Sequence, residues 1–161
     1  MRCFTILPLL FAAGCSNAPQ QQAVAPNAAE LMESGQWHVE SEVTALRSTD
    51  KSTPALKIPV GTTASHDACV PEADRKKPAP VLFTGKDYSC KYDNLYVSNG
   101  LINGSLSCTK PGLSGQVLMS VDGSYTATSF DAELSMTSYL SGSGDFASTA
   151  KLAGKRTGAC A

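Results

Sequence analysis

The sequence predicts a mainly β protein: a curved antiparallel meander sheet or half-barrel of six to eight strands, with one short helix and two disulfides. Stretches in which apolar and polar residues alternate recur along the chain, separated by turn residues about every eight to twelve positions. An Asn-Gly pair lies midway between Cys90 and Cys108, which is typical of a β-hairpin. A sheet of this size curls or covers its edges, because open edges pair with other chains.

Residues 1–14 are predicted to be a signal peptide. Arg2 supplies a positive charge, and the apolar stretch after it is too short to span a bilayer. The next residues, AAGC, resemble the lipobox of bacterial lipoproteins, in which the cysteine becomes the acylated N-terminus. We therefore expect Cys15 to carry the lipid anchor. Ordinary signal-peptidase cleavage near Gly14 or Ala18 is the alternative.

Residues 15–34 are predicted to be a flexible tether, because they are rich in Ala, Gln, Pro and Asn and nearly lack bulky apolar groups. The tether would join the anchor to a single β-rich domain, residues 35–161. Several acyl chains on one cysteine hold a protein on a membrane effectively permanently. Ser16 is typical of lipoproteins sorted to the outer membrane, so we expect the domain on the periplasmic face of that membrane.

The folded domain begins with a predicted strand. Between Trp37 and Val43, apolar residues alternate with polar ones, which indicates one buried and one solvated face. The polar stretch 48–68 is expected to be a loop. A short helix is predicted at residues 69–74, because Pro71 suits a first helical turn.

The stretch between Cys90 and Cys108 is the predicted hairpin. A three-residue loop, Ser98 to Gly100, would place four residue pairs opposite one another: Tyr96 with Ile102, Asn94 with Gly104, Tyr92 with Leu106, and Cys90 with Cys108. In that register a disulfide closes the far end of the hairpin. A two-residue turn is the alternative, and it would shift the register by one residue and spoil this cysteine pairing.

Cys69 and Cys160 then form the second disulfide by elimination, since an even number of exported cysteines implies complete pairing. Zinc binding is not expected, because the cysteine spacings contain no closely spaced pair.

Further strands are predicted after Cys108. A turn at residues 110–112 precedes the strand GQVLMSV, and a second turn is expected at Asp122-Gly123. Another strand runs from Phe130, where apolar residues again alternate with polar ones. A turn over Ser141 to Asp145 leads into the last strand.

The composition favours neither nucleic-acid binding nor catalysis. The chain has 13 Lys and Arg against 14 Asp and Glu, so it lacks a basic excess. His38, Glu40 and Glu42 share one face of a strand, but the outer two lie about 13 Å apart and cannot hold one ion. His66 precedes Cys69, yet a disulfide-bonded cysteine cannot be a nucleophile. We expect no enzymatic activity and no cofactor.

Several short motifs occur in a distinctive order: GQW at 35–37, CVPE at 69–72, CKY at 90–92, GSY at 123–125 and RTGAC at 156–160. Together they resemble a bacterial family catalogued as domain of unknown function 3617. The resemblance covers about residues 34–161. It implies a small exported or lipid-anchored envelope protein, and it transfers no activity and no site residues.

We therefore expect a non-enzymatic envelope lipoprotein that binds an apolar or glycan ligand in the concavity of its sheet, or an envelope protein on its surface. Ligand binding requires that Tyr92, Leu106, Met119 and Phe130 leave part of the concave face open. The alternative is an inhibitor of a cell-wall hydrolase such as lysozyme, with Ser141 to Asp145 as its inhibitory loop.

Overall fold

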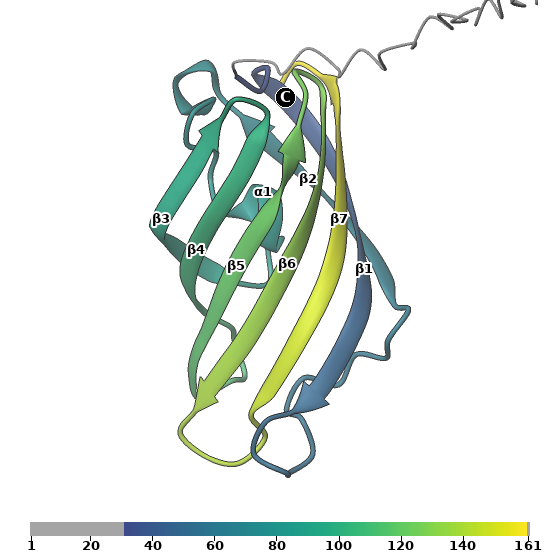
Figure 1. Cartoon of the computed structure of the whole chain (residues 1–161), viewed down its shortest axis with the longest axis vertical. Coiled ribbons are helices and arrows are strands. Elements are labelled where there is room, and N and C mark those ends of the chain that lie inside the picture. The colour runs from purple at the N-terminus through teal and green to yellow at the C-terminus, as the bar shows by residue number, and fades with distance from the viewer. Residues whose placement is uncertain (1–30, 161) are drawn as a thin grey trace, which may run out of the picture.

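A seven-stranded antiparallel sheet makes up most of the structure (Figure 1), a computed structural model that describes residues 31–160. The strands are β1 (Gly35–Ser48), β2 (Thr63–Val70), β3 (Ser89–Ser98), β4 (Leu101–Thr109), β5 (Gly115–Tyr125), β6 (Ser129–Leu140) and β7 (Phe146–Gly158). A 3-10 turn, η1 (Glu72–Asp74), and a short helix, α1 (Val81–Thr84), lie between β2 and β3. The predicted fold class is confirmed.

The strand order is β2-β1-β7-β6-β5-β4-β3. Strands β3 to β7 form a meander, and β1 then pairs with β7 on one side and β2 on the other. The first and last strands are therefore neighbours inside the sheet, next to the edge strand β2. Among residues 31–160, no helix is long and apolar enough to cross a membrane.

The hydrophobic core lies on the concave side of the sheet, on the side where α1 is seen behind the strands in Figure 1. Helix α1 packs against β1 and β2. Its Phe83 ring meets Phe130 of β6 edge-on, with 5.4 Å between centroids, and Trp37 of β1 lies 5.9 Å from Phe130 on another side. These three fully buried aromatic rings fill the half of the concave face nearest the start of β1.

The β3–β4 hairpin has a two-residue turn, not the predicted three-residue loop. Asn99 and Gly100 have φ values of 53° and 74°, which match the twist of the flanking strands. Near the turn the register is therefore shifted by one residue: the predicted pairs Tyr96 with Ile102 and Asn94 with Gly104 are wrong. Ile102 faces Val97 instead, and Gly104 faces Leu95.

A β-bulge restores the predicted register in the second half of the hairpin. The ladder shifts between Tyr92 and Asn94, so Asp93 is the extra residue. Its carboxylate accepts a hydrogen bond of 2.7 Å from the hydroxyl of Ser107. Beyond the bulge Tyr92 pairs with Leu106, and Cys90 with Cys108, as predicted.

Both expected disulfides are present in the structure. Cys90 and Cys108 form the short bridge, across 18 positions, and Cys69 and Cys160 form the long one, across 91 positions. The long bridge connects the end of the edge strand β2 to the chain just after β7.

Three predicted elements are wrong. The loop expected over 48–68 contains the start of β2. This edge strand shows little alternation of apolar and polar residues, because only Ala68 and Val70 are buried. The turn expected at Asp122-Gly123 lies inside β5, where Gly123 packs against the backbone of β6. The helix expected at 69–74 is reduced to η1, which buries no residue.

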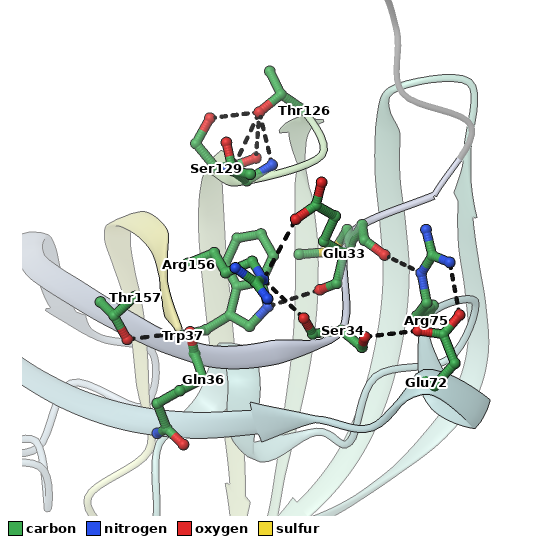
Figure 2. Close-up of polar contacts among 12 residues, drawn as sticks. Glu33, Ser34, Gln36, Trp37, Glu72, Arg75, Thr126, Ser129, Arg156 and Thr157 are labelled. Atoms are coloured by element: carbon green, nitrogen blue, oxygen red, sulfur yellow. Dashed lines mark hydrogen bonds and ion pairs between the residues drawn. The ribbon is translucent and has the colours of Figure 1, made fainter. Parts of the chain in front are cut away.

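The segment before β1 belongs to the fold, although the sequence places it in the tether. Met32 is fully buried. The Nε of Arg75 donates to the carbonyl oxygen of Met32 at 2.6 Å, and the Nε of Arg156 donates to that of Ser34 at 2.8 Å (Figure 2). The indole Nε1 of Trp37 donates to the carbonyl of Glu33 at 3.2 Å. Side-chain donors thus bind three consecutive backbone carbonyls, which form no hydrogen bonds within the sheet.

The same two arginines make ion pairs. Arg75 contacts Glu72 at 2.8 Å, and Arg156 contacts Glu33 at 3.5 Å (Figure 2). Glu72 also accepts a hydrogen bond from the hydroxyl of Ser34, and this bond and the arginine lower the pKa of Glu72. Residues 32–34 are thereby fixed at the end of the sheet where β1 begins.

Candidate ligand-binding site

A cavity of about 500 Å³ lies on the concave face, between the later half of β1 and strands β2, β6 and β7. Its floor consists of inward-facing residues of β6 and β7: Leu134, Met136, Ser148, Ala150 and Leu152. This volume falls in the range of small-molecule sites. The concave face is therefore filled near the start of β1 and hollow beside the middle of β1.

The hollow arises partly because several inward positions around it carry small side chains. Ser41 of β1 faces Ala64 on β2 and Leu152 on β7, and Ala150 and Ser148 follow on β7. The corresponding positions at the other end carry Trp37 and the other large rings. Of the residues that the sequence suggested might fill the concavity, Phe130 lies at that end. Leu106 and Met119 are buried on β4 and β5, in the same row as Met136 but outside the cavity lining. The Tyr92 hydroxyl donates to the carbonyl of Pro78 at 2.9 Å.

The loop between β1 and β2 closes one side of the cavity. Leu56, which is buried, and Ile58 both line it. The loop is fixed to the β6–β7 turn: the Asp50 carboxylate accepts hydrogen bonds from the backbone N–H groups of Gly144 at 2.8 Å and Asp145 at 3.1 Å. Hydrogen bonds from the side chain and backbone of Ser52, together with these two, hold the pKa of Asp50 well below its usual range.

The segment after α1 forms the other side of the opening. Gly85 has φ 70° and ψ −176°, a conformation that favours glycine, and it lies beside the His66 ring. The His66 Nε2 lies 3.3 Å from the carbonyl of Leu82 in α1. Tyr88 also lines the cavity, and burial raises its pKa.

Three hydroxyl groups of the cavity already donate to the backbone. Ser148 donates to the carbonyl of Ala45 at 2.9 Å, Ser41 to that of Ala64 at 3.2 Å, and Thr84 to that of Pro80 at 3.1 Å. Within the described part of the chain no buried side-chain polar atom lacks a partner. The interior of the cavity therefore presents mostly apolar surface to a ligand.

The polar residues that the sequence singled out lie apart from one another. On the convex face, His38 Nδ1 lies 2.8 Å from the Asp67 carboxylate across the β1–β2 pair. His66 points to the concave side, and Cys69 is in its disulfide. Among residues 31–160 there is no cluster of three His, Cys, Asp or Glu side chains that could hold a metal ion.

Two other predicted features are not part of the cavity. Cys15 lies outside the described residues, so its acylation stays a prediction. In the loop from Ser141 to Asp145, the Asp145 carboxylate accepts hydrogen bonds from the Ser138 hydroxyl at 2.9 Å and the Leu140 N–H at 2.8 Å. The one charged side chain of that loop is thus engaged within the protein.

A second hollow, of about 610 Å³, lies on the convex face. Its outward-facing charged residues are Glu40, Glu42, Asp131 and Lys151. Lys151 lies opposite Glu42 on one side and Glu133 on the other, so a cation separates the acids. This surface is solvated and offers an apolar ligand little to bind.

The cavity could not have been located from the sequence motifs, because none of them includes its floor. The available signal is the run of small residues at alternate positions of β7, Ser148 and Ala150, together with Ser41 of β1. Those positions identify a hollow only once the strand register brings them together.

Comparison with known proteins gives one match. No curated protein and no solved structure matches the chain significantly. One family model, described as "Protein of unknown function (DUF3617)", matches residues 32–160. The match begins at Met32, the buried residue that opens the folded domain, and it ends at Cys160 of the long disulfide. The chain therefore belongs to the DUF3617 family.

Proposed function

We propose that this protein is a non-enzymatic binding module of the bacterial cell envelope, whose concave cavity takes a small, mainly apolar ligand. The observation that carries the proposal is the cavity of about 500 Å³ with an apolar floor. A glycan needs many free donors and acceptors, whereas the hydroxyls of Ser41, Thr84 and Ser148 in the cavity are already hydrogen-bonded to the backbone and its floor is largely apolar. An apolar ligand is therefore favoured over a glycan.

The leader sequence and the two disulfides support the envelope location, since disulfides persist in oxidising compartments. We propose that Cys15 carries the lipid anchor and that the domain sits on the periplasmic face of the outer membrane. Mass spectrometry of the protein from membranes tests this, with an acylated N-terminal Cys15 as the expected species. An intact leader would contradict it.

An inhibitor of a cell-wall hydrolase has less support. Its proposed loop, Ser141 to Asp145, uses its carboxylate inside the protein and leaves no free charge for an enzyme's cleft. Unchanged lysozyme activity in the presence of excess protein is the expected result.

Titration of the domain with the neutral fluorescent dye N-phenyl-1-naphthylamine tests ligand binding. We expect saturable binding of one dye molecule per chain. Ala64 is exposed and lies on the cavity side of β2, so Ala64→Phe narrows the opening without overfilling the core and weakens binding. Ala153→Phe, on the exposed convex face, is the matched control and leaves binding unchanged. Absence of dye binding, or equal binding by both variants, contradicts the proposed function.

A further inference from the structure

We infer that the ligand is an amphiphile with an anionic end, whose apolar part lies on the cavity floor and whose anionic group lies at the opening between Lys86 and His66. The inference rests on the proposed function, because it assigns the chemical class of ligand for the same cavity.

At the opening of the cavity the acidic side chains have charged partners, whereas one basic side chain has none among the described residues. Four titratable residues other than Tyr88 line the cavity: His66, Asp67, Lys86 and Asp87. Both acids have partners outside it: Asp67 lies 2.8 Å from His38, and Asp87 lies 3.3 Å from Lys110. Lys86 makes no hydrogen bond or ion pair with the described residues 31–160. The opening thus has a cation without a counter-ion, and a ligand anion would complement it.

The second polar group at the opening is the ring of His66. The carbonyl of Leu82 can only accept a hydrogen bond, so the Nε2 that contacts it at 3.3 Å carries the proton. The other nitrogen, Nδ1, faces Gly85: a Cβ on that residue would lie 3.6 Å from Nδ1. The glycine leaves this side of the ring uncovered, and Lys86 is the next residue in the chain.

The size of the cavity limits the apolar part. A methylene group occupies about 30 Å³, close to the share of one water molecule in the liquid, so a chain of ten carbons needs about 300 Å³. The cavity of about 500 Å³ accommodates such a chain together with a small head group. Floor residues such as Leu134, Met136 and Leu152 contact the chain, while the head group stays at the solvated opening.

The experiment compares three ligands with the same ten-carbon chain: decanoate, 1-decanol and decyltrimethylammonium. Each displaces N-phenyl-1-naphthylamine from the folded domain, and the apparent affinities are compared at low ionic strength. We expect decanoate to bind about tenfold more tightly than decanol, and decyltrimethylammonium to bind most weakly. Lys86→Gln lowers the affinity for decanoate about fivefold and leaves that for decanol unchanged.

Lys91→Gln is the matched control. Lys91 is exposed on β3 and does not line the cavity, so this variant makes the same change in net charge elsewhere. Equal affinities for the three ligands, or equal losses of decanoate affinity in the two lysine variants, contradict the inference that the ligand has an anionic end. The proposed binding function would then still stand. If neither the dye nor any of the three ligands binds, the proposed function fails and the inference fails with it. Equal thermal midpoints establish that both variants are folded.

Discussion

Gly154 of β7 leaves room for an aromatic ring in the core. A Cβ at this position would overlap the ring of Phe130. Trp37 and Phe83 flank that ring, so it cannot move aside without disturbing them. The absence of a side chain at one strand position thus allows three aromatic rings to pack.

Gly154→Ala should lower the free energy of unfolding by about 2 kcal/mol, because the added methyl group overfills a packed core. Strand propensity alone predicts the opposite sign, since Ala restricts the unfolded chain more than Gly does. Chemical denaturation measures the difference. Gly158→Ala is the control, because a Cβ there has open space around it, and it should have little effect. Similar effects of the two substitutions would contradict this account of the core.

At the residue scale, the sequence was most informative about cysteines and least informative about small side chains. Cys90 and Cys108 could be paired because a turn signal lies midway between them. Ser41, Ser148 and Ala150 carry no such signal, since small residues are common on any strand. Their importance appears only when the register places them around one hollow.

At the scale of elements, the two loops at the cavity end depend on Asp50. Its carboxylate accepts hydrogen bonds from Ser48, from Ser52 and from two N–H groups of the β6–β7 turn. The bonds from Ser52, and those from the two N–H groups of the turn, lower its pKa in the folded protein. A lowered pKa means that the charged carboxylate stabilises the fold above the pKa of an unfolded Asp, about 4, and that this stabilisation is lost as the pH falls further.

Asp50→Asn should therefore lower the thermal midpoint at pH 7, and the gap from the wild type should shrink steadily below about pH 4. Thermal unfolding followed by circular dichroism between pH 7 and pH 2.5 measures both. A gap that stays constant over this range would show that the carboxylate charge is not what holds the two loops.

The β3–β4 turn requires a residue that tolerates a positive φ at position 99. Asn99 has φ 53°, and its side-chain amide donates to the Tyr96 hydroxyl at 3.3 Å. Asn99→Ala should lower the free energy of unfolding by about 1 kcal/mol, because a residue with an ordinary Cβ is strained there. Asn99→Gly is the comparison and should have a smaller effect. A cost for Gly equal to that for Ala would mean that the side-chain amide, not the backbone conformation, matters most.

Element prediction succeeded where one face of a strand is buried and failed where burial is partial. β1 and β6 alternate clearly because their inward residues enter the core. β2 is an edge strand with few buried residues, and α1 is only one turn long, so neither shows a reliable period. The bulge at Asp93 could not be predicted from the sequence, because an extra residue between the two cysteines fits equally well in the turn or in a strand.

At the scale of the whole molecule, the disulfides differ in the length of chain that they close. The Cys69–Cys160 bridge spans 91 positions and the Cys90–Cys108 bridge spans 18. In the chain-entropy model the long bridge contributes about 4.5 kcal/mol and the short one about 3 kcal/mol. Replacing both cysteines of the long bridge by serine should therefore destabilise the protein more than the same change at the short bridge.

Denaturant unfolding of the two double-serine variants measures this order. The reverse order would show that the short bridge supports the hairpin through contacts that loop length does not describe.

The fold and the family could be predicted for the whole domain, since motif order and cysteine spacing extend along all of it. The site could not, because a cavity is a property of how strands are registered and curved. The sequence-based expectation did include the condition on which ligand binding depends, which is that part of the concave face stays unfilled. The structure meets that condition at the end of the sheet closed by Leu56 and Ile58.

The most direct test of the cavity as the ligand site is the methyl NMR spectrum of the methionines during titration with decanoate. Met136 lines the cavity, whereas Met32 is buried in the segment before β1 and does not line it. The account predicts a saturable shift of the Met136 methyl resonance and an unchanged resonance of Met32, while Met119, the neighbour of Met136 on β5, is not used as a control. Saturable binding that leaves the Met136 resonance unchanged would place the ligand elsewhere and contradict the account.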